Sequence, residues 1–290
     1  MLKNEEIRIR DPFVLPIKDE QTYYLYGTTD DNVWEGKGTG FDVYKSHDLK
    51  NWEGPFPAFR PSVDFWAEHH FWAPEVYEYA GRYYMFATFK AETQCRGTQV
   101  LMSEHPIGPF QPLTEQPITP REWECLDGTL FIDENEKPWM IFCHEWLQVQ
   151  DGKICAMPLS LDLREAIGEP VVLFSASEAA WTRGEGRYVT DGPYLYRNKQ
   201  GQLQMLWSSQ GDNGYAIGVA RSTSGSILGP WTHDSTPLFG ESGGHGMLFQ
   251  TFSGEQLLTI HTPNQSPKER PAFFEVKEED GTLMLGERLE

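Results

Sequence analysis

The sequence predicts an all-β fold, and more narrowly a five-bladed β-propeller with four antiparallel strands in each blade. The first observation is a short segment that recurs five times, in which a polar residue opens a run of alternating apolar residues. The second is that a polar turn and then an aromatic strand come after each of these segments. The five opening segments span residues 10–15, 72–77, 126–131, 188–196 and 244–249.

The polar residues of these opening segments are regularly spaced, with 64, 52, 64 and 54 residues between them. Self-similarity at a period of about 58 residues is typical of a radial repeat, and four-stranded blades around a channel form a propeller. In a propeller the innermost strands begin near one face of the channel, so we expect these side chains to converge. They are Asp11, Glu75, Asp127, Asp191 and His245.

The remaining strands are expected in the same order within each unit. The second strands are predicted at 23–27, 83–87, 139–143, 203–207 and 256–260. The third strands, several of which end in serine, are predicted at 41–46, 98–103, 154–160, 215–222 and 271–278. Fourth strands close the units, as at 171–174 and 282–285. No linker or low-complexity tract divides the chain, so we expect a single domain over 1–290; the alternative is an open β-sandwich with accidental internal similarity.

Charge and composition exclude two classes of partner. The chain has 290 residues, with 24 Lys+Arg against 43 Asp+Glu and a formal net charge of −19. Nucleic acids and anionic membranes both attract basic surfaces, so neither is expected to bind. A small neutral oligosaccharide is compatible with this charge, and an aromatic content of 13% suits sugar faces as well as strand packing.

The ends and the cysteines indicate the compartment. Residues 1–6 are charged and lack the apolar stretch of a signal peptide. No run of about 18 apolar residues predicts a membrane span. The four cysteines have no Cys-x-x-Cys spacing, which favours buried free thiols. Together these features predict a cytoplasmic protein.

Carboxylates gathered at one end of a channel are costly unless they are solvated, paired or used. Close carboxylates also push one another's pKa values apart, so that one becomes a proton donor while another stays a base. Two carboxyl groups on opposite sides of a sugar ring are what glycosidic cleavage requires. Taken singly, each Asp before Gly or Pro is more simply a turn residue, and only its recurrence favours the hydrolytic interpretation.

The opening motifs also resemble those of glycoside hydrolase family 43, whose members are five-bladed propellers. The resemblance implies a general base at Asp11 in Arg-Asp-Pro-Phe, and a general acid at Asp191 in Thr-Asp-Gly-Pro. It implies that Asp127 in Leu-Asp-Gly-Thr tunes the pKa of the acid and orients it. Glu75 lies in a Trp-Ala-Pro-acid motif, and His245 corresponds to an axial histidine that can lie near a structural calcium or a water. No cofactor is expected to be required.

One departure from the family pattern concerns the acid. The family usually has Glu where Asp191 stands, and Asp is shorter by one C–C bond, about 1.5 Å. Either the sugar lies deeper, or another carboxylate donates the proton. Glu145 is the better substitute and Glu185 the weaker one. The implied mechanism is inverting, with the carboxyls of Asp11 and Asp191 about 6.5–9.5 Å apart.

Substrate contacts are expected from aromatic residues near the predicted mouth, together with the polar openers. A sugar face can stack on such rings, although core packing or loop anchoring explains each of them equally well. His69 and His70, just before Trp72, are read as passive surface histidines. The expected substrate-binding residues are Trp72, Glu75, Phe71, Trp34, Trp146 and His245.

The resulting functional hypothesis is an exo-acting enzyme that releases terminal α-L-arabinofuranose from short oligosaccharides. A β-D-xylosidase or a β-D-galactofuranosidase is the alternative within the same family. From a different class, a non-catalytic sugar-binding propeller is the alternative that the Asp at position 191 permits. The sequence does not predict an oligomeric state.

Overall fold

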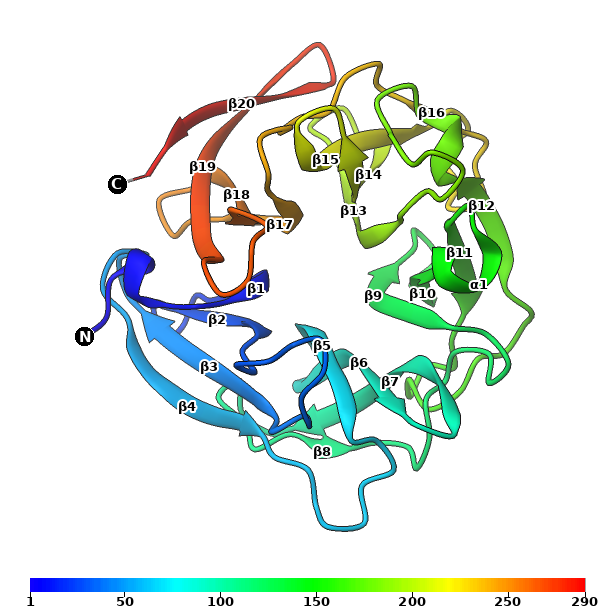
Figure 1. Cartoon of the computed structure of the whole chain (residues 1–290). Coiled ribbons are helices and arrows are strands. Elements are labelled where there is room, and N and C mark those ends of the chain that lie inside the picture. Colours follow the sequence, from blue (N-terminus) through cyan, green and yellow to red (C-terminus); the bar gives the residue numbers. More distant parts are fainter. Residues whose placement is uncertain (290) are drawn as a thin grey trace.

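The computed structural model describes residues 1–289 and forms a ring of five four-stranded antiparallel sheets (Figure 1). Strands that follow one another in sequence pair within each sheet, so every blade is a meander that runs outwards from the channel. The predicted five-bladed propeller with four antiparallel strands per blade is confirmed.

The first blade contains β1 (Arg10–Ile17), β2 (Thr22–Thr28), β3 (Phe41–Ser46) and β4 (Glu53–Phe59). The second contains β5 (His69–Tyr79), β6 (Arg82–Ala91), β7 (Gln94–Ser103) and β8 (Gln111–Pro112). The third contains β9 (Cys125–Ile132), β10 (Pro138–His144), β11 (Lys153–Pro158) and β12 (Val171–Ser175). The fourth contains β13 (Asp191–Arg197), β14 (Leu203–Gly211), β15 (Gly214–Ser222) and β16 (Trp231–His233). The fifth contains β17 (Gly244–Gln250), β18 (Gln256–Thr262), β19 (Arg270–Glu279) and β20 (Thr282–Arg288).

Three short helices were not predicted. They are η1 (Asn4–Glu6), α1 (Trp146–Val149) and η2 (Ala176–Glu178), and segments of three or four residues carry no helical periodicity to detect. Among residues 1–289, no helix has the length and apolar character needed to cross a membrane.

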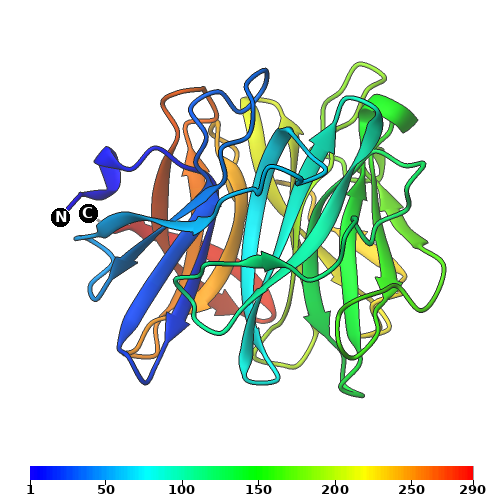
Figure 2. The same cartoon turned by 90° about the horizontal axis from the view of Figure 1, so that it is seen from below.

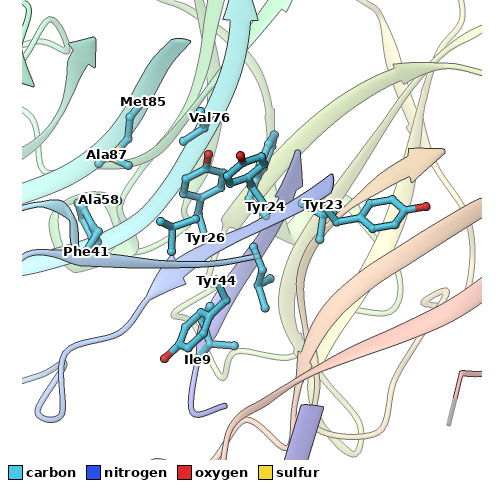
Figure 3. Close-up of a cluster of buried hydrophobic side chains, with 14 of the residues drawn as sticks. Ile9, Tyr23, Tyr24, Tyr26, Phe41, Tyr44, Ala58, Val76, Met85 and Ala87 are labelled. Atoms are coloured by element: carbon cyan, nitrogen blue, oxygen red, sulfur yellow. The ribbon is translucent and has the colours of Figure 1, made fainter. Parts of the chain in front are cut away.

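The blades pack face to face, which explains why their middle strands are buried on both sides. Every residue of β2 is buried. Its tyrosines belong to one apolar cluster with residues of the second and fifth blades. Figure 3 shows part of this cluster, where Tyr24 and Tyr26 gather with Phe41 of β3 and with Val76 and Met85 of the second blade. Alternating strand side chains therefore fill both inter-blade layers.

The first and last blades meet without exchanging a strand, and we call their junction the seam. Figures 1 and 2 show the two ends of the chain on the same side of the ring. Across the seam, the Ile9 N–H donates to the Glu269 carbonyl at 3.3 Å. The guanidinium of Arg10 pairs with the carboxylate of Glu269 at 2.8 Å, and the Glu269 side chain is fully buried.

The innermost strand of every blade has a β-bulge at the equivalent place, at the start of the strand in four blades and four residues into β5, which has an earlier irregularity as well. A bulge redirects side chains and ends the regular pairing, which is why bulges are frequent at functional sites. In each bulge one residue has a positive φ. These residues are Asp11 (52°), Ala73 (46°), Asp127 (55°), Gly192 (51°) and His245 (45°).

This register corrects the alignment of the opening segments in two blades. The equivalent of Asp11 is Ala73 in the second blade, two residues before Glu75, and Gly192 in the fourth, one residue after Asp191. The sequence alignment matched polar residues with one another, but the strand pairing sets the bulge, and a bulge can hold Ala or Gly.

The bulge residues also connect neighbouring blades through what we call the junction contact. In it, the backbone N–H of the bulge residue donates to a side chain on the second strand of the preceding blade. Four junctions have it: Ala73 to Thr28 Oγ1 at 2.8 Å, Asp127 to Thr88 Oγ1 at 2.9 Å, His245 to Ser208 Oγ at 2.8 Å, and Asp11 to His261 Nδ1 at 3.1 Å. Between the third and fourth blades, Cys143 occupies the acceptor position, and the Gly192 N–H donates to Asp127 Oδ2 at 3.0 Å instead.

Candidate active site

A pocket of about 530 Å³ opens where the bulges face the channel. Its rim includes Trp146 and Leu147 of α1, the short green helix at the upper edge of Figure 2. The structure brings most of the predicted site residues to this one pocket. Those that line it are Asp11, Trp34, Trp72, Asp127, Glu145, Trp146, Asp191 and His245.

Asp11 is buried and held as a carboxylate. Its Oδ2 accepts a hydrogen bond from Thr28 Oγ1 at 2.7 Å, and its Oδ1 lies 3.2 Å from His245 Nδ1. Burial acts to raise the pKa of Asp11, but His245, Arg10, His261 and the Thr28 bond outweigh it, so the pKa lies below its ordinary value. Because burial lowers the pKa of His245 itself, the permanent cation beside Asp11 at neutral pH is Arg10.

Asp127 approaches the same ring nitrogen of His245 as Asp11 does, with His245 Nδ1 3.6 Å from Asp127 Oδ2. The same oxygen accepts the Gly192 N–H. Burial, and then the carboxylates of Asp191 and Asp11, raise the pKa of Asp127 well above its ordinary value. Asp127 is therefore protonated under conditions in which Asp11 is ionised, which is the division of states that close carboxylates produce.

Asp191 begins β13, and its carboxyl faces the pocket. Tyr215 of β15 donates its hydroxyl hydrogen to Asp191 Oδ2 at 2.9 Å. Burial raises the pKa of Asp191 to about 7; the Tyr215 bond opposes this, while the Asp11 and Glu145 carboxylates add to it. A carboxyl with this pKa can donate a proton near neutral pH, as a general acid must.

Glu145 also lines the pocket, but its carboxylate is paired with Arg96, and both side chains are buried. Burial raises the pKa of Glu145 above its ordinary value, although the guanidinium of Arg96 opposes this shift. A carboxylate held against a permanent cation is a poor proton donor, so the contacts favour Asp191 for that role. Glu185 is exposed and does not line the pocket.

The aromatic residues are not equivalent. Trp34 is 52% exposed, on the loop between β2 and β3, and can offer a ring to a ligand. Trp72 has the His70 ring stacked on it, with centroids 4.2 Å apart, and Arg96 lies 4.5 Å from its ring centroid. Because His70 and Arg96 both contact the ring of Trp72, this side chain is held within the rim of the pocket. Phe71 is buried in the apolar core and does not reach the pocket.

His70 connects this rim, in contrast to the passive surface role expected for it. Its Nε2 donates to the Trp34 carbonyl at 3.0 Å, and its Nδ1 accepts from Arg96 at 3.0 Å. Burial first, and then Arg96, lower the pKa of His70 to about 4, so the ring is neutral at pH 7. Trp72 Nε1 also donates to the Val33 carbonyl at 2.7 Å. These contacts fix the loop that carries Trp34.

Glu75 lies below the pocket and does not line it. Its Oε2 accepts hydrogen bonds from Tyr77 at 2.5 Å and from Thr129 at 2.6 Å. Burial raises the pKa of Glu75 to about 7. The corrected register explains this position, because Glu75 is equivalent to Phe13 and Thr129 rather than to Asp11.

Sequence reasoning missed several residues that line the pocket or support it. Arg96 and Tyr215 lie on third strands and His261 on a second strand, none within a recurring motif. Arg10 stood in an opening motif, but nothing in the sequence marked its contacts with Asn264 and Glu269, both at 2.8 Å. These pairs join residues far apart in the chain, so only the closed ring reveals them.

The expected calcium has no evident ligand set. In the described part of the chain, no group of three or more His, Cys, Asp or Glu side chains is arranged to hold a metal ion. His245 directs Nδ1 at two carboxylates, and its buried Nε2 has no protein partner. No chemical step is assigned to a metal ion at His245.

Two known proteins similar in sequence are arabinofuranosidases. The extracellular exo-α-(1→5)-L-arabinofuranosidase ArbA of Cellvibrio japonicus is 23% identical over 302 residues, which cover 89% of this chain and 79% of that protein. An extracellular exo-α-(1→5)-L-arabinofuranosidase of Streptomyces chartreusis is 29% identical over 182 residues, 59% of this chain and 53% of that protein.

Solved structures are similar over nearly the whole chain. The crystal structure of an endo-arabinase from Bacteroides thetaiotaomicron has a TM-score of 0.90 and 42% identity, covering 97% of this chain and 99% of that one. An endo-1,4-β-xylanase from the same organism has a TM-score of 0.82 and 28% identity, covering 99% and 97%. The sequence pattern of glycosyl hydrolases family 43 matches residues 6–278. The chain belongs to this family and is a glycoside hydrolase.

Proposed function

We propose that this family 43 hydrolase is an exo-acting α-L-arabinofuranosidase that releases terminal arabinofuranose from short oligosaccharides with inversion. Two relatives named exo-arabinofuranosidases support the sugar, as does the similarity to an endo-arabinase. The observation that carries the proposal is the bounded pocket of about 530 Å³ with three aspartates at its base. Its size lies within the range of about 300–1,000 Å³ of small-ligand pockets.

In the proposed mechanism, Asp11 is the general base and Asp191 the general acid. Asp11 takes a proton from a water that attacks the anomeric carbon on the face opposite the leaving group. Asp191 gives its proton to the departing oxygen as the C–O bond breaks. Asp127 binds the Gly192 N–H, next to Asp191, and so holds the acid in position. Glu145 stays paired with Arg96 and does not take the acid role.

Trp34 is the proposed stacking surface at the mouth, because it is the exposed ring at the rim. Trp146 of α1 lines the same pocket and is the second proposed aromatic contact. Trp72 supports the rim through His70 and Arg96 rather than by stacking on sugar. His245 directs its Nδ1 at the carboxyls of both Asp11 and Asp127 and so links the proposed base with the residue that positions the acid.

A panel of 4-nitrophenyl glycosides tests the sugar. We expect nitrophenol release from the α-L-arabinofuranoside and little from the β-D-xyloside or the β-D-galactofuranoside. The similarity to a xylanase gives the xyloside a specific place in the panel. Cleavage of the xyloside or galactofuranoside alone would overturn the choice of sugar.

Product analysis tests the mode of attack. Linear α-1,5-linked arabino-oligosaccharides should yield arabinose alone from the first minutes, whereas an endo enzyme would yield shorter oligosaccharides. Proton NMR of the newly released sugar should show the β anomer first, because inversion of an α linkage produces it. Initial release of the α anomer would reject the inverting mechanism.

A cytoplasmic location is also part of the proposal, and it suits short imported oligosaccharides. The feature that supports it is the set of four cysteines, all of them free thiols in the structure. The curated relatives are named extracellular, which makes the question specific. Fractionation of the source cells should find the arabinofuranosidase activity in the cytosol, and recovery from the medium would contradict this.

A further inference from the structure

We propose that Tyr215 and His261 act together as positioning residues that set the separation between Asp191 and Asp11 across the pocket. The inference rests on the acid and base roles proposed above for these two aspartates. Tyr215 comes from β15 in the fourth blade and His261 from β18 in the fifth, so the pair spans one blade junction.

Tyr215 is held firmly enough to position another group. Its hydroxyl donates to Asp191 Oδ2 at 2.9 Å, and the residue is only 3% exposed. Its ring stacks on His261, with centroids 5.6 Å apart and an interplanar angle of 17°. Gly244 leaves room for the ring, because a Cβ there would lie 2.9 Å from Tyr215 Cε1.

His261 is fixed on its other side by the first blade. It is fully buried, its Nδ1 accepts the Asp11 N–H at 3.1 Å, and its Nε2 donates to Asn264 Oδ1 at 3.1 Å. These partners select one tautomer of a neutral ring. The same Asn264 oxygen accepts a hydrogen bond from Arg10 at 2.8 Å. The stacked pair is therefore anchored to the backbone of Asp11 and, through Asn264, to the neighbouring Arg10.

The contact with Tyr215 bears on how Asp191 can act as the acid although it is shorter than the Glu that the family usually has. A general acid must come within about 2.6–3.2 Å of the oxygen that it protonates, and Asp reaches about 1.5 Å less far than Glu. With Oδ2 held by the Tyr215 hydroxyl, the proton of Asp191 resides on Oδ1. From there it passes to the glycosidic oxygen, which keeps the electron pair of the breaking C–O bond.

The variant Tyr215→Phe tests this directly, because it removes the hydroxyl and keeps the ring that stacks on His261. We expect kcat for a 4-nitrophenyl glycoside to fall about tenfold, the upper end of the effect of losing a hydrogen bond to a neutral carboxyl. A dinitrophenyl glycoside, whose leaving group departs without a proton, should lose at most about threefold, since acid catalysis contributes little to it.

The pH profile supplies a readout that a purely structural role would not move. A hydrogen bond donated to a carboxylate favours its ionised form, so its loss raises the pKa of Asp191. The basic limb of kcat/KM should therefore move to higher pH in Tyr215→Phe. The other charged groups that face Asp191 stay unchanged in this variant; they are Asp11, Asp127, Glu145 and Arg10.

The variant His261→Gln tests the other half of the pair. It disturbs the contact with the Asp11 N–H, and Asp11 acts on the water whatever the leaving group is. We expect both aryl glycosides to lose activity by the same factor, with the basic limb unmoved. A loss that depends on the leaving group in Tyr215→Phe, together with an equal loss for both glycosides in His261→Gln, would show that Tyr215 positions Asp191 and His261 positions Asp11.

Tyr196→Phe is the matched control. Tyr196 is another buried tyrosine of the fourth blade, and its hydroxyl donates to Gln204 Oε1 at 2.5 Å, away from the pocket. It should leave the leaving-group ratio and the pH profile unchanged. If Tyr215→Phe lowers the rates of both glycosides equally and leaves the basic limb in place, the inference is wrong. The ratio does not depend on the folded fraction, so partial instability does not mask the result.

The assay uses whichever aryl glycoside the wild-type enzyme cleaves. An error in the proposed sugar would therefore appear in the panel of glycosides and leave this comparison intact.

Discussion

The five blade junctions fall into two kinds, and the difference separates scaffold from chemistry. At four of them a bulge N–H donates to a Thr, Ser or His side chain of the preceding blade. Between the third and fourth blades the acceptor position holds Cys143, a weak acceptor, and the carboxyl of Asp127 receives the Gly192 N–H.

The exceptional junction is therefore built from a residue of the active site. Asp127 donates its own N–H to Thr88 in the usual way and uses its side chain to bind the next blade. One residue thus joins three blades and positions Asp191, which lies beside the glycine that it binds. The junction that departs from the other four is thus the one in which a carboxyl of the active site accepts the bulge N–H.

The largest effect is expected at the conventional junction of the seam. Asp11→Asn removes the proposed base but keeps its backbone contact with His261. Activity should fall by about 10²–10⁴-fold, the usual contribution of a general base, while the melting temperature stays close to that of the wild type. Thermal melts and rates on the same preparation check this, and a variant that retains a tenth of the activity would contradict it.

Asp127 at the exceptional junction should tolerate one substitution better than another. Asp127→Asn resembles the protonated acid and keeps an oxygen for the Gly192 N–H, whereas Asp127→Ala leaves that N–H unpaired. We expect Asp127→Ala to lose about 1–3 kcal/mol of unfolding free energy and at least tenfold more activity than Asp127→Asn. Equal losses in the two variants would mean that the hydrogen bond from the Gly192 N–H to the side chain of residue 127 does not matter.

The pKa values of Asp11 and Asp191 predict how activity depends on pH. Activity requires Asp11 ionised and Asp191 protonated. The pKa of Asp11 is lowered, so the acidic limb should lie below pH 4, and the pKa of Asp191 is about 7, so activity should fall about tenfold per pH unit above 7. Profiles of kcat/KM from pH 3 to 10 measure both limbs, and full activity at pH 9 would exclude Asp191 as the acid.

A matched pair sharpens the comparison within the conventional junctions. Thr88→Val and Thr28→Val each remove one junction contact, at a cost of about 1–3 kcal/mol of stability. Thr28 also donates to Asp11 Oδ2, so only Thr28→Val should raise the pKa of Asp11. The acidic limb should move to higher pH in that variant and stay in place in Thr88→Val.

The smallest effect is expected from restoring the usual chemistry at the exceptional junction. Cys143→Ser places a hydroxyl where three other blades have one, next to Thr190, whose side chain contacts the Cys143 thiol. Stability should change by no more than about 1 kcal/mol. Activity should fall slightly, because the new hydroxyl competes with Asp127 for the Gly192 N–H. A large loss of activity would mean that Cys143 has a role of its own.

The sequence predicted the architecture well because each blade repeats one local pattern. The third strand of the first blade, 41–46, coincides with β3, and the openers at Asp11 and Asp127 mark the start of the inner strand. Local patterning failed at Glu75, because the position of a bulge depends on strand pairing rather than on residue type.

The parts of the site that escaped prediction are those made by side-chain contacts between strands that are not neighbours in the sequence. Tyr215 and Arg96 lie in ordinary third strands, and nothing around them in the sequence distinguishes them from core residues. Their partners, Asp191 and Glu145, are 24 and 49 residues away. Tyr215 and Asp191 meet within the fourth blade and Arg96 and Glu145 meet across two blades, and neither pairing follows from a local sequence pattern.

The ion pair between Arg10 and Glu269 gives the seam a further meaning. It joins the two ends of the ring at the residue next to the proposed base, and its acidic partner is fully buried. Any fluctuation that separates the first blade from the fifth must break the Arg10–Glu269 pair and displace Asp11. Catalytic turnover would then be an early reporter of ring opening, lost on heating before the sheets themselves melt.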